Sequence, residues 1–356
     1  MRGAIRNCFS GWVPAATGSF LSRRRVIGLV LGSLLIFIAQ GNVAFAHEGW
    51  FVEKGQHPGE HFPLDWITAV TALGFILFFA WAMSVDRSRW SERLQKLCYK
   101  GECFLPRGRE WRIVAVLSGV TLIANSVTGV FLAPNLILPG ERLVMLGGVA
   151  QVIIGLLLVS QISFFVPGLL ILVVAVPLAA ISFAPALMID YLFEFVALAL
   201  AFVLLGLDGG YLDRRLPHWL RQRMSGSAHL PLPLIRIGLG LTLIVLAAHN
   251  KLISPDLALT FLDKYDLNFI PYLGFAEFTN LHFVFAAGMA ELAIGLFLVL
   301  GIGTRFVAAT LMMFLLTTLV VLGPLELVGH LPVLGLAAVL LYRGSGGYRL
   351  ATAPAS

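Results

Sequence analysis

The chain has 356 residues, of which 58% are hydrophobic and only 12% are charged. A soluble globular domain has about 25% charged residues, so this composition excludes a water-soluble protein and indicates an integral membrane protein. The net charge of +6 does not indicate nucleic-acid binding, because the basic residues lie where membrane topology places them. Apolar runs of about 20 residues favour helices over barrel strands, so we expect an all-α, polytopic helix bundle in a lipid bilayer.

The first 46 residues have the pattern of an export signal. Arg23–Arg25 precede a short apolar run that ends at Ala44-Phe45-Ala46. A basic region, a short apolar region and an A-x-A site are typical of a cleavable signal peptide. Ser22-Arg23-Arg24 also faintly resembles a twin-arginine signal. We therefore predict an N-terminal extension and signal over 1–46, with an uncleaved first helix as the alternative.

Nine apolar segments follow the signal and a short polar segment at 47–63. We predict a leading span with a basic loop over 64–111, a first four-helix unit over 112–230, a second four-helix unit over 231–345, and a tail over 346–356. The expected spans are 64–85, 113–133, 143–161, 163–183, 188–207, 232–253, 281–301, 303–323 and 326–342.

The placement of basic residues predicts the orientation of these spans. With the N-terminal region inside, all but four of the 25 Lys and Arg residues fall on the cytoplasmic side. Such a bias is typical of inner-membrane proteins. We therefore expect a bacterial-type inner-membrane protein with segment 47–63 outside and the C-terminus in the cytoplasm.

Two of the predicted spans carry the same pattern around a polar residue. Val149–Leu156 and Met289–Leu296 share the order small, polar, apolar, apolar, Ile, Gly, Leu, with Gln151 in the first copy and Glu291 in the second. An ionised side chain in the middle of a bilayer helix costs about 2.5–3.5 kcal/mol, so such residues face protein or water and often mark function. The pattern indicates an internal repeat.

The second unit holds the stronger candidate site. Glu326 and His330 are four residues apart, which places them on one helix face. Together with Lys251 and Glu291 they predict a polar cluster in the outer half of the membrane. It would serve as a quinone head-group site, a proton relay or a site for a small polar substrate. The alternative is a structural clasp that holds the bundle, with Lys251 extending to the interface.

His249 and Asn250 adjoin Lys251 and are the candidate cofactor contacts. In the first unit, polar residues are fewer and nothing corresponds to Lys251. A structural clasp is the favoured interpretation for the first unit's candidate residues, with Asp190 alternatively at the membrane interface; these candidates are Asn125, Gln151, Asp190 and Glu194.

The polar segment after the signal contains three histidines, His47, His57 and His61. Cleavage after Ala46 would leave His47 with a free amine, and amine and imidazole nitrogens suit Cu(II). A copper site is therefore one hypothesis and an ordinary polar loop is the other. The cytoplasmic pair Cys98 and Cys103 lacks the second pair of a zinc ribbon and is interpreted as two reduced thiols.

The second unit resembles the DoxX/DoxD-like membrane proteins. The residues that carry the resemblance are Arg236–Gly240 with Asn250–Leu252, Ala290–Gly295 with Gly301–Arg305, and Glu326 with Gly329–Pro332. The resemblance covers about 236–345 well and 112–207 weakly. It implies a four-helix membrane unit tied to respiratory or redox-stress complexes, one branch of which is linked to quinone-dependent thiosulfate oxidation. No residue pattern diagnostic of a sulfur site is present in this chain.

The leading hypothesis is therefore a DoxX-like membrane subunit of a redox complex that binds quinone or relays protons for a respiratory or redox partner. In this scheme Glu291 and Glu326 relay protons, His330 shares one, and Lys251 holds the anionic form. A copper-handling or transport protein is the alternative, and a non-catalytic membrane scaffold is a third. The sequence does not establish that the chain is an enzyme.

Overall fold

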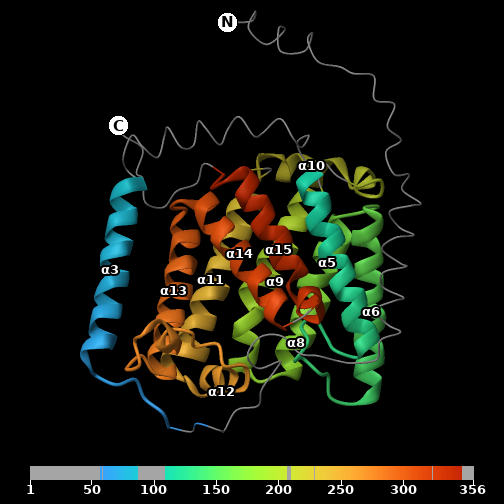
Figure 1. Cartoon of the computed structure of the whole chain (residues 1–356). Helices are drawn as coiled ribbons and strands as arrows, with labels where there is room; N and C mark the ends of the chain where they lie inside the picture. The colour runs from blue at the N-terminus through green and yellow to red at the C-terminus, as the bar shows by residue number, and fades with distance from the viewer. Residues whose placement is uncertain are drawn as a thin grey trace, which may run out of the picture. The chain divides into compact units, whose positions relative to one another are not determined.

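The structure is a computed structural model of the chain. It describes residue 57 and residues 59–86, 109–206, 210–227, 229–322 and 324–346; at 85, 86, 225, 320–322 and 324–327 only the backbone is described. The described part is helical and contains no β-strand, which confirms the predicted all-α bundle (Figure 1). The predicted signal, His47, both loop cysteines and the tail lie outside the described residues.

Seven described helices are long and apolar enough to cross a membrane, so the prediction of a multi-pass membrane protein is confirmed. Two further apolar helices, α14 (Thr304–Leu322) and α15 (Pro324–Arg343), contain shorter apolar stretches. The leading span is α3 (Trp66–Asp86). Its exposed apolar side chains are those of a helix that faces lipid.

The third membrane helix of the first half is interrupted. It consists of α7 (Phe165–Leu170), the π-helix η2 (Ile171–Ala175) and α8 (Val176–Ser182). Pro177 has no backbone N–H and cannot bond to the carbonyl four residues earlier, which favours the wider turn that precedes it. The other helices of this half are α5 (Arg109–Thr128), α6 (Glu141–Ser160) and α9 (Pro185–Leu205).

The second half opens with α11 (Pro231–Ala247), which continues as the π-helix η5 (Ala248–Ile253). Successive membrane helices run in alternating directions between two ends of the bundle, which we call the α10 end and the α12 end after the short helices that lie there (Figure 1). The remaining helices that define the ends and the second half are α10 (His218–Met224), α12 (Asp256–Tyr265) and α13 (Asn280–Leu300).

The two halves contain equivalent helix pairs. A Cβ added to Gly119 of α5 would lie 2.7 Å from the carbonyl oxygen of Gly155 on α6, and a Cβ on Gly240 of α11 would lie 2.7 Å from that of Gly295 on α13. Glycines bring membrane helices this close because they have no side chain. The matching geometry supports the internal repeat and gives Gln151 and Glu291 equivalent positions, each four residues before its glycine.

Each half also packs on the other. Gly238 of α11 faces α9, where its added Cβ would lie 2.8 Å from the carbonyl oxygen of Phe193. In the same way Gly335 of α15 faces α5, with an added Cβ 3.3 Å from Cα of Val114. The last membrane helix of each half thus packs along the first helix of the other half. The described residues accordingly belong to one compact unit, within which the predicted boundary at 231 is a division by sequence.

At the α10 end, a hydrogen bond joins the start of α14 to the end of α15. Gly301 and Gly303 adopt positive φ values of 77° and 51° in the turn between α13 and α14. This turn places Arg305 so that its Nη2 donates to the carbonyl oxygen of Tyr342 at 3.0 Å, near the end of α15. A cation at a helix C-terminus interacts favourably with the helix dipole, so the Gly-Ile-Gly-Thr-Arg segment fastens α15 to α14.

Candidate functional site

Lys251 and Glu291 form an ion pair inside the second half. Nζ of Lys251 on η5 lies 3.0 Å from Oε2 of Glu291 on α13, and the two side chains are 18% and 20% exposed. Gly288, almost one turn before Glu291, leaves room for the lysine, because a Cβ there would lie 3.0 Å from Cβ of Lys251. The structure therefore brings these two predicted site residues together, as a carboxylate and a cation that offset each other's burial.

His249 and Asn250 reach across to the first half. Nδ1 of His249 lies 3.1 Å from Oδ1 of Asp190 on α9, and Nδ2 of Asn250 lies 3.5 Å from the other carboxyl oxygen. Asp190 is buried, whereas the His249 side chain is 32% exposed. The π-helix η5 thus carries one contact to α9 and, through Lys251, another to α13. These two predicted cofactor contacts join the two halves of the bundle.

Gln151 holds a buried loop between α5 and α6. Its Oε1 accepts a hydrogen bond from the Leu132 backbone N–H at 2.7 Å, and its Nε2 donates to the Val130 carbonyl oxygen at 2.9 Å. Asn125 donates from Nδ2 to the carbonyl oxygen of Leu132 at 2.8 Å. Leu132 has a positive φ of 64°, which a residue other than glycine adopts at a cost. Gln151 and Asn125 therefore act as the structural clasp that their sequence positions favoured.

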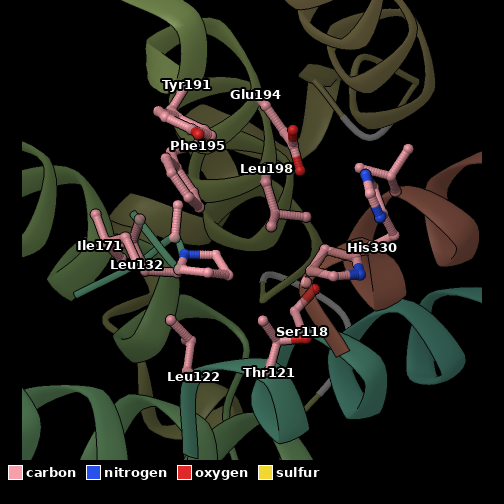
Figure 2. A pocket seen from close by; sticks show the side chains of 15 residues that line it. Ser118, Thr121, Leu122, Leu132, Ile171, Tyr191, Glu194, Phe195, Leu198 and His330 are labelled. Atoms are coloured by element: carbon pink, nitrogen blue, oxygen red, sulfur yellow. The ribbon is translucent and has the colours of Figure 1, made fainter. Parts of the chain in front are cut away.

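A pocket lies between the two halves, and it brings Glu194 of α9 together with His330 of α15. The cavity has a volume of about 40 Å³, which is room for roughly two or three water molecules. Figure 2 shows Glu194, His330, Ser118 and Thr121 on one side of the pocket, with Tyr191 and apolar side chains on the other. The full lining is Ser118, Thr121, Leu122, Leu132, Ala133, Pro134, Ile171, Tyr191, Glu194, Phe195, Leu198, Gly329, His330, Pro332 and Val333.

The helix α15 lacks one backbone hydrogen bond beside this pocket. Pro332 lies within the helix and has no N–H to bond to the carbonyl oxygen of Val328. Oγ1 of Thr121 on α5 donates to that oxygen at 2.8 Å. Neighbouring side chains commonly satisfy a carbonyl released by proline in a membrane helix. Gly329 and His330 are therefore presented to the pocket by a turn of helix whose backbone bonds to α5.

Ser118 contributes a buried hydroxyl group to the wall of the pocket. The residue is 2% exposed, and its Oγ has no hydrogen-bond partner among the described residues. In a membrane helix a serine hydroxyl ordinarily bonds to a carbonyl of the preceding turn. Ser118 therefore adds a buried hydroxyl to the polar groups that line the pocket.

Two members of the predicted cluster pair on η5 and α13, and a third lines the pocket. Lys251 and Glu291 pair with each other, and neither lines the pocket that holds His330. The backbone of Glu326 lies in α15, but its side chain is outside the described residues. Glu194, interpreted from sequence as part of a clasp, lines the pocket. In the sequence, the spacing of four residues between Asp190 and Glu194 is the pattern that indicates a polar helix face here. Nothing in the sequence distinguishes Ser118 from other serines.

Two more His–Asp contacts lie at the α12 end, besides that of His249 with Asp190. His57 donates from its backbone N–H to Asp256 at 2.7 Å, and its Nε2 lies 2.7 Å from Oδ2 of Asp263. His61 is exposed, and among the described residues no three His, Cys, Asp or Glu side chains gather where they could hold a metal ion. Because His47 lies outside those residues, the copper site stays a prediction.

The second contact joins the start of α3 to α13. Asp65 accepts a hydrogen bond from the backbone N–H of Thr68 at 2.9 Å, and Nε2 of His282 lies 2.8 Å from its other oxygen. The Thr68 amide, and after it His282, hold the pKa of Asp65 below its usual value. The carboxylate therefore caps α3 and ties it to the bundle.

Comparison of the chain with protein-family models, curated proteins and solved structures finds no match.

Proposed function

We propose that this chain is a membrane subunit that passes protons for a redox partner, through the pocket between its two halves. The observation that carries the proposal is that a carboxyl group, Glu194, and an imidazole, His330, line the same water-sized pocket inside the bundle. Both side chains can take up and release a proton. Ionisable groups within membrane helices are costly to retain, and proton relays are one of the uses to which they are put.

The size of the pocket favours protons over quinone. Space for two or three waters is enough to connect carboxyl, imidazole and hydroxyl groups by hydrogen bonds, but it is small for a quinone ring. The relay proposed here also differs in its residues from the one expected from sequence. Glu194 and His330 take the central part, and the Lys251–Glu291 pair joins η5 to α13.

The orientation is part of the proposal. We assign the α12 end to the outside of an inner membrane and the α10 end to the cytoplasm. Support comes from the bias of basic residues, since the segment at the α10 end contains Arg214, Arg215, Arg221 and Arg223. The DoxX-like assignment and the association with a redox partner rest on the sequence resemblance.

The test measures protons moved per electron in sealed membrane vesicles of a strain in which the chain is replaced by variants, with a quinol as electron donor. Glu194→Gln removes the proton-carrying group with little change of shape, and we expect it to lower the ratio. Glu141→Gln is the matched control, because Glu141 is an exposed acid at the start of α6. An unchanged ratio in Glu194→Gln, with normal protein level, would contradict the proposal.

A quinone site gives a different result. Binding of a short-chain quinone to the purified protein would then be saturable and would weaken in Glu194→Gln or His330→Gln. The proton-relay proposal expects no such binding at the pocket.

A further inference from the structure

A row of polar groups leads from the α12 end to the pocket. His249 on η5 is partly exposed and lies 3.1 Å from the buried carboxylate of Asp190. Asp190 and Glu194 are four residues apart on α9, which places them on the same helix face about one turn apart. Glu194 in turn lines the pocket. The row therefore passes from one half of the bundle to the other and then inward.

We infer that His249 and Asp190 form the entrance through which protons reach the pocket from the α12 end. This inference rests on the proposed function and names its route. An imidazolium at His249 gives the proton on Nδ1 to Oδ1 of Asp190 and becomes neutral. The carboxylic acid then gives a proton to the Glu194 carboxylate through one water. Only protons move, and no oxidant or reductant is required.

The proposed route takes one water between the carboxyl groups of Asp190 and Glu194. Side chains at positions i and i+4 of a helix have Cβ atoms about 5–6 Å apart, a distance that a single bridging water spans. Beyond Glu194, the pocket that Ser118 and His330 also line has room for the next water. The route continues from that water toward His330.

The other titratable groups around the route are held by partners of their own. Tyr191, next to Asp190 in sequence, donates from its hydroxyl to Oδ1 of Asn135 at 2.8 Å. Lys251, on the same π-helix as His249, is paired with Glu291. On α15 the facing group is His330, which is the acceptor side of the route. Nδ2 of Asn250 can donate to Oδ2 of Asp190 in either protonation state, because the transferred proton lies on Oδ1.

The experiment follows protonation of Glu194 in nanodiscs after a light-triggered pH jump, by time-resolved infrared spectroscopy of the carboxyl C=O band. The band that is lost in Glu194→Gln identifies this residue. In Asp190→Asn we expect the same band to form to its full final amplitude but more slowly, by roughly tenfold or more. Asp190→Glu, which keeps an acid at the position, should restore most of the rate, and Glu141→Gln should not alter it.

The outcomes separate the route from the function. If no C=O band depends on Glu194, the proposed function fails together with the route. If the band is present and forms at the wild-type rate in Asp190→Asn, the entrance is overturned while the relay stands. A full final amplitude in Asp190→Asn shows that the variant is folded, and His249→Gln gives a second measurement that should be slowed in the same way.

Discussion

Gln151 and Glu291 occupy equivalent positions in two equivalent helix pairs, but they bind different partners. Gln151 donates to Val130 and accepts from Leu132, so it needs both ends of an amide. Glu291 faces the ammonium group of Lys251, so it needs a negative charge. After the duplication that the pattern indicates, one copy of the position came to hold a loop and the other to hold a charged π-helix.

The amide at Gln151 can be tested by Gln151→Glu. A carboxylate can still accept from Leu132 but cannot donate to the Val130 carbonyl, and the site is buried. We expect a loss of about 2–4 kcal/mol in the free energy of unfolding, measured by denaturant titration in detergent. Gln161→Glu, at the half-buried end of the same helix, is the control and should cost less than about 0.5 kcal/mol. Equal losses in the two variants would contradict the donor role.

The Lys251–Glu291 pair predicts a stability effect that a second substitution reverses. Glu291→Gln removes the carboxylate that lies 3.0 Å from the partly buried ammonium and should cost about 1–3 kcal/mol. Adding Lys251→Met should recover part of that loss, because it removes the ammonium group that Glu291 had paired with. A double-mutant cycle in thermal unfolding measures the coupling. Additive losses would show that the pair contributes nothing as a pair.

The close glycine contact predicts a large effect from a single methyl group. Gly240→Ala would place Cβ 2.7 Å from the carbonyl oxygen of Gly295, and backbone cannot move aside cheaply. We expect destabilisation of about 1–3 kcal/mol, and a similar value for Gly119→Ala in the equivalent pair. Gly74→Ala on α3 is the matched control, since nothing lies within 4 Å of an added Cβ there. Its unfolding temperature should be unchanged or slightly higher.

The Asp65 contacts predict a loss of stability in acid. The Thr68 amide and His282 lower the pKa of Asp65 in the folded chain. The Asp65 carboxylate therefore stabilises the fold at pH values above its usual pKa of 3.8. That contribution is lost as the pH falls through the lowered pKa. The difference in unfolding temperature between wild type and Asp65→Asn should therefore shrink as the pH is lowered from 6 toward about 3. A difference that is constant with pH would exclude a role for the Asp65 charge.

The membrane helices could be predicted from the sequence because apolar length and helix spacing are local properties. The spans begin and end within a few residues of the expected limits, as α9 shows at Pro185–Leu205 against 188–207. The sequence also predicted that Lys251 and Glu291 lie close together, because both belong to one repeat unit and carry opposite charges. In these cases the relevant physics acts within one helix or between neighbouring helices.

The pocket could not be predicted in the same way because it depends on contacts between the halves. Glu194 and His330 are far apart in sequence, and they meet only because α9 and α15 each pack on the opposite half. The same is true of Asp190 and His249. Periodicity shows which face of a helix is polar, but not which helix of the other half that face will meet.

The last membrane helix of each half packs on the first helix of the other half, and this arrangement also sets the order in which contacts form during synthesis. The helices α5 and α9 are synthesised before α15. Until α15 is inserted, Glu194 of α9 lacks the helix that forms the other wall of its pocket. Thr121 likewise has no Val328 carbonyl to bind until α15 arrives. The pocket is thus the last part of the bundle to close, and a nascent chain arrested before α15 would expose an acidic side chain to lipid or to the insertion machinery.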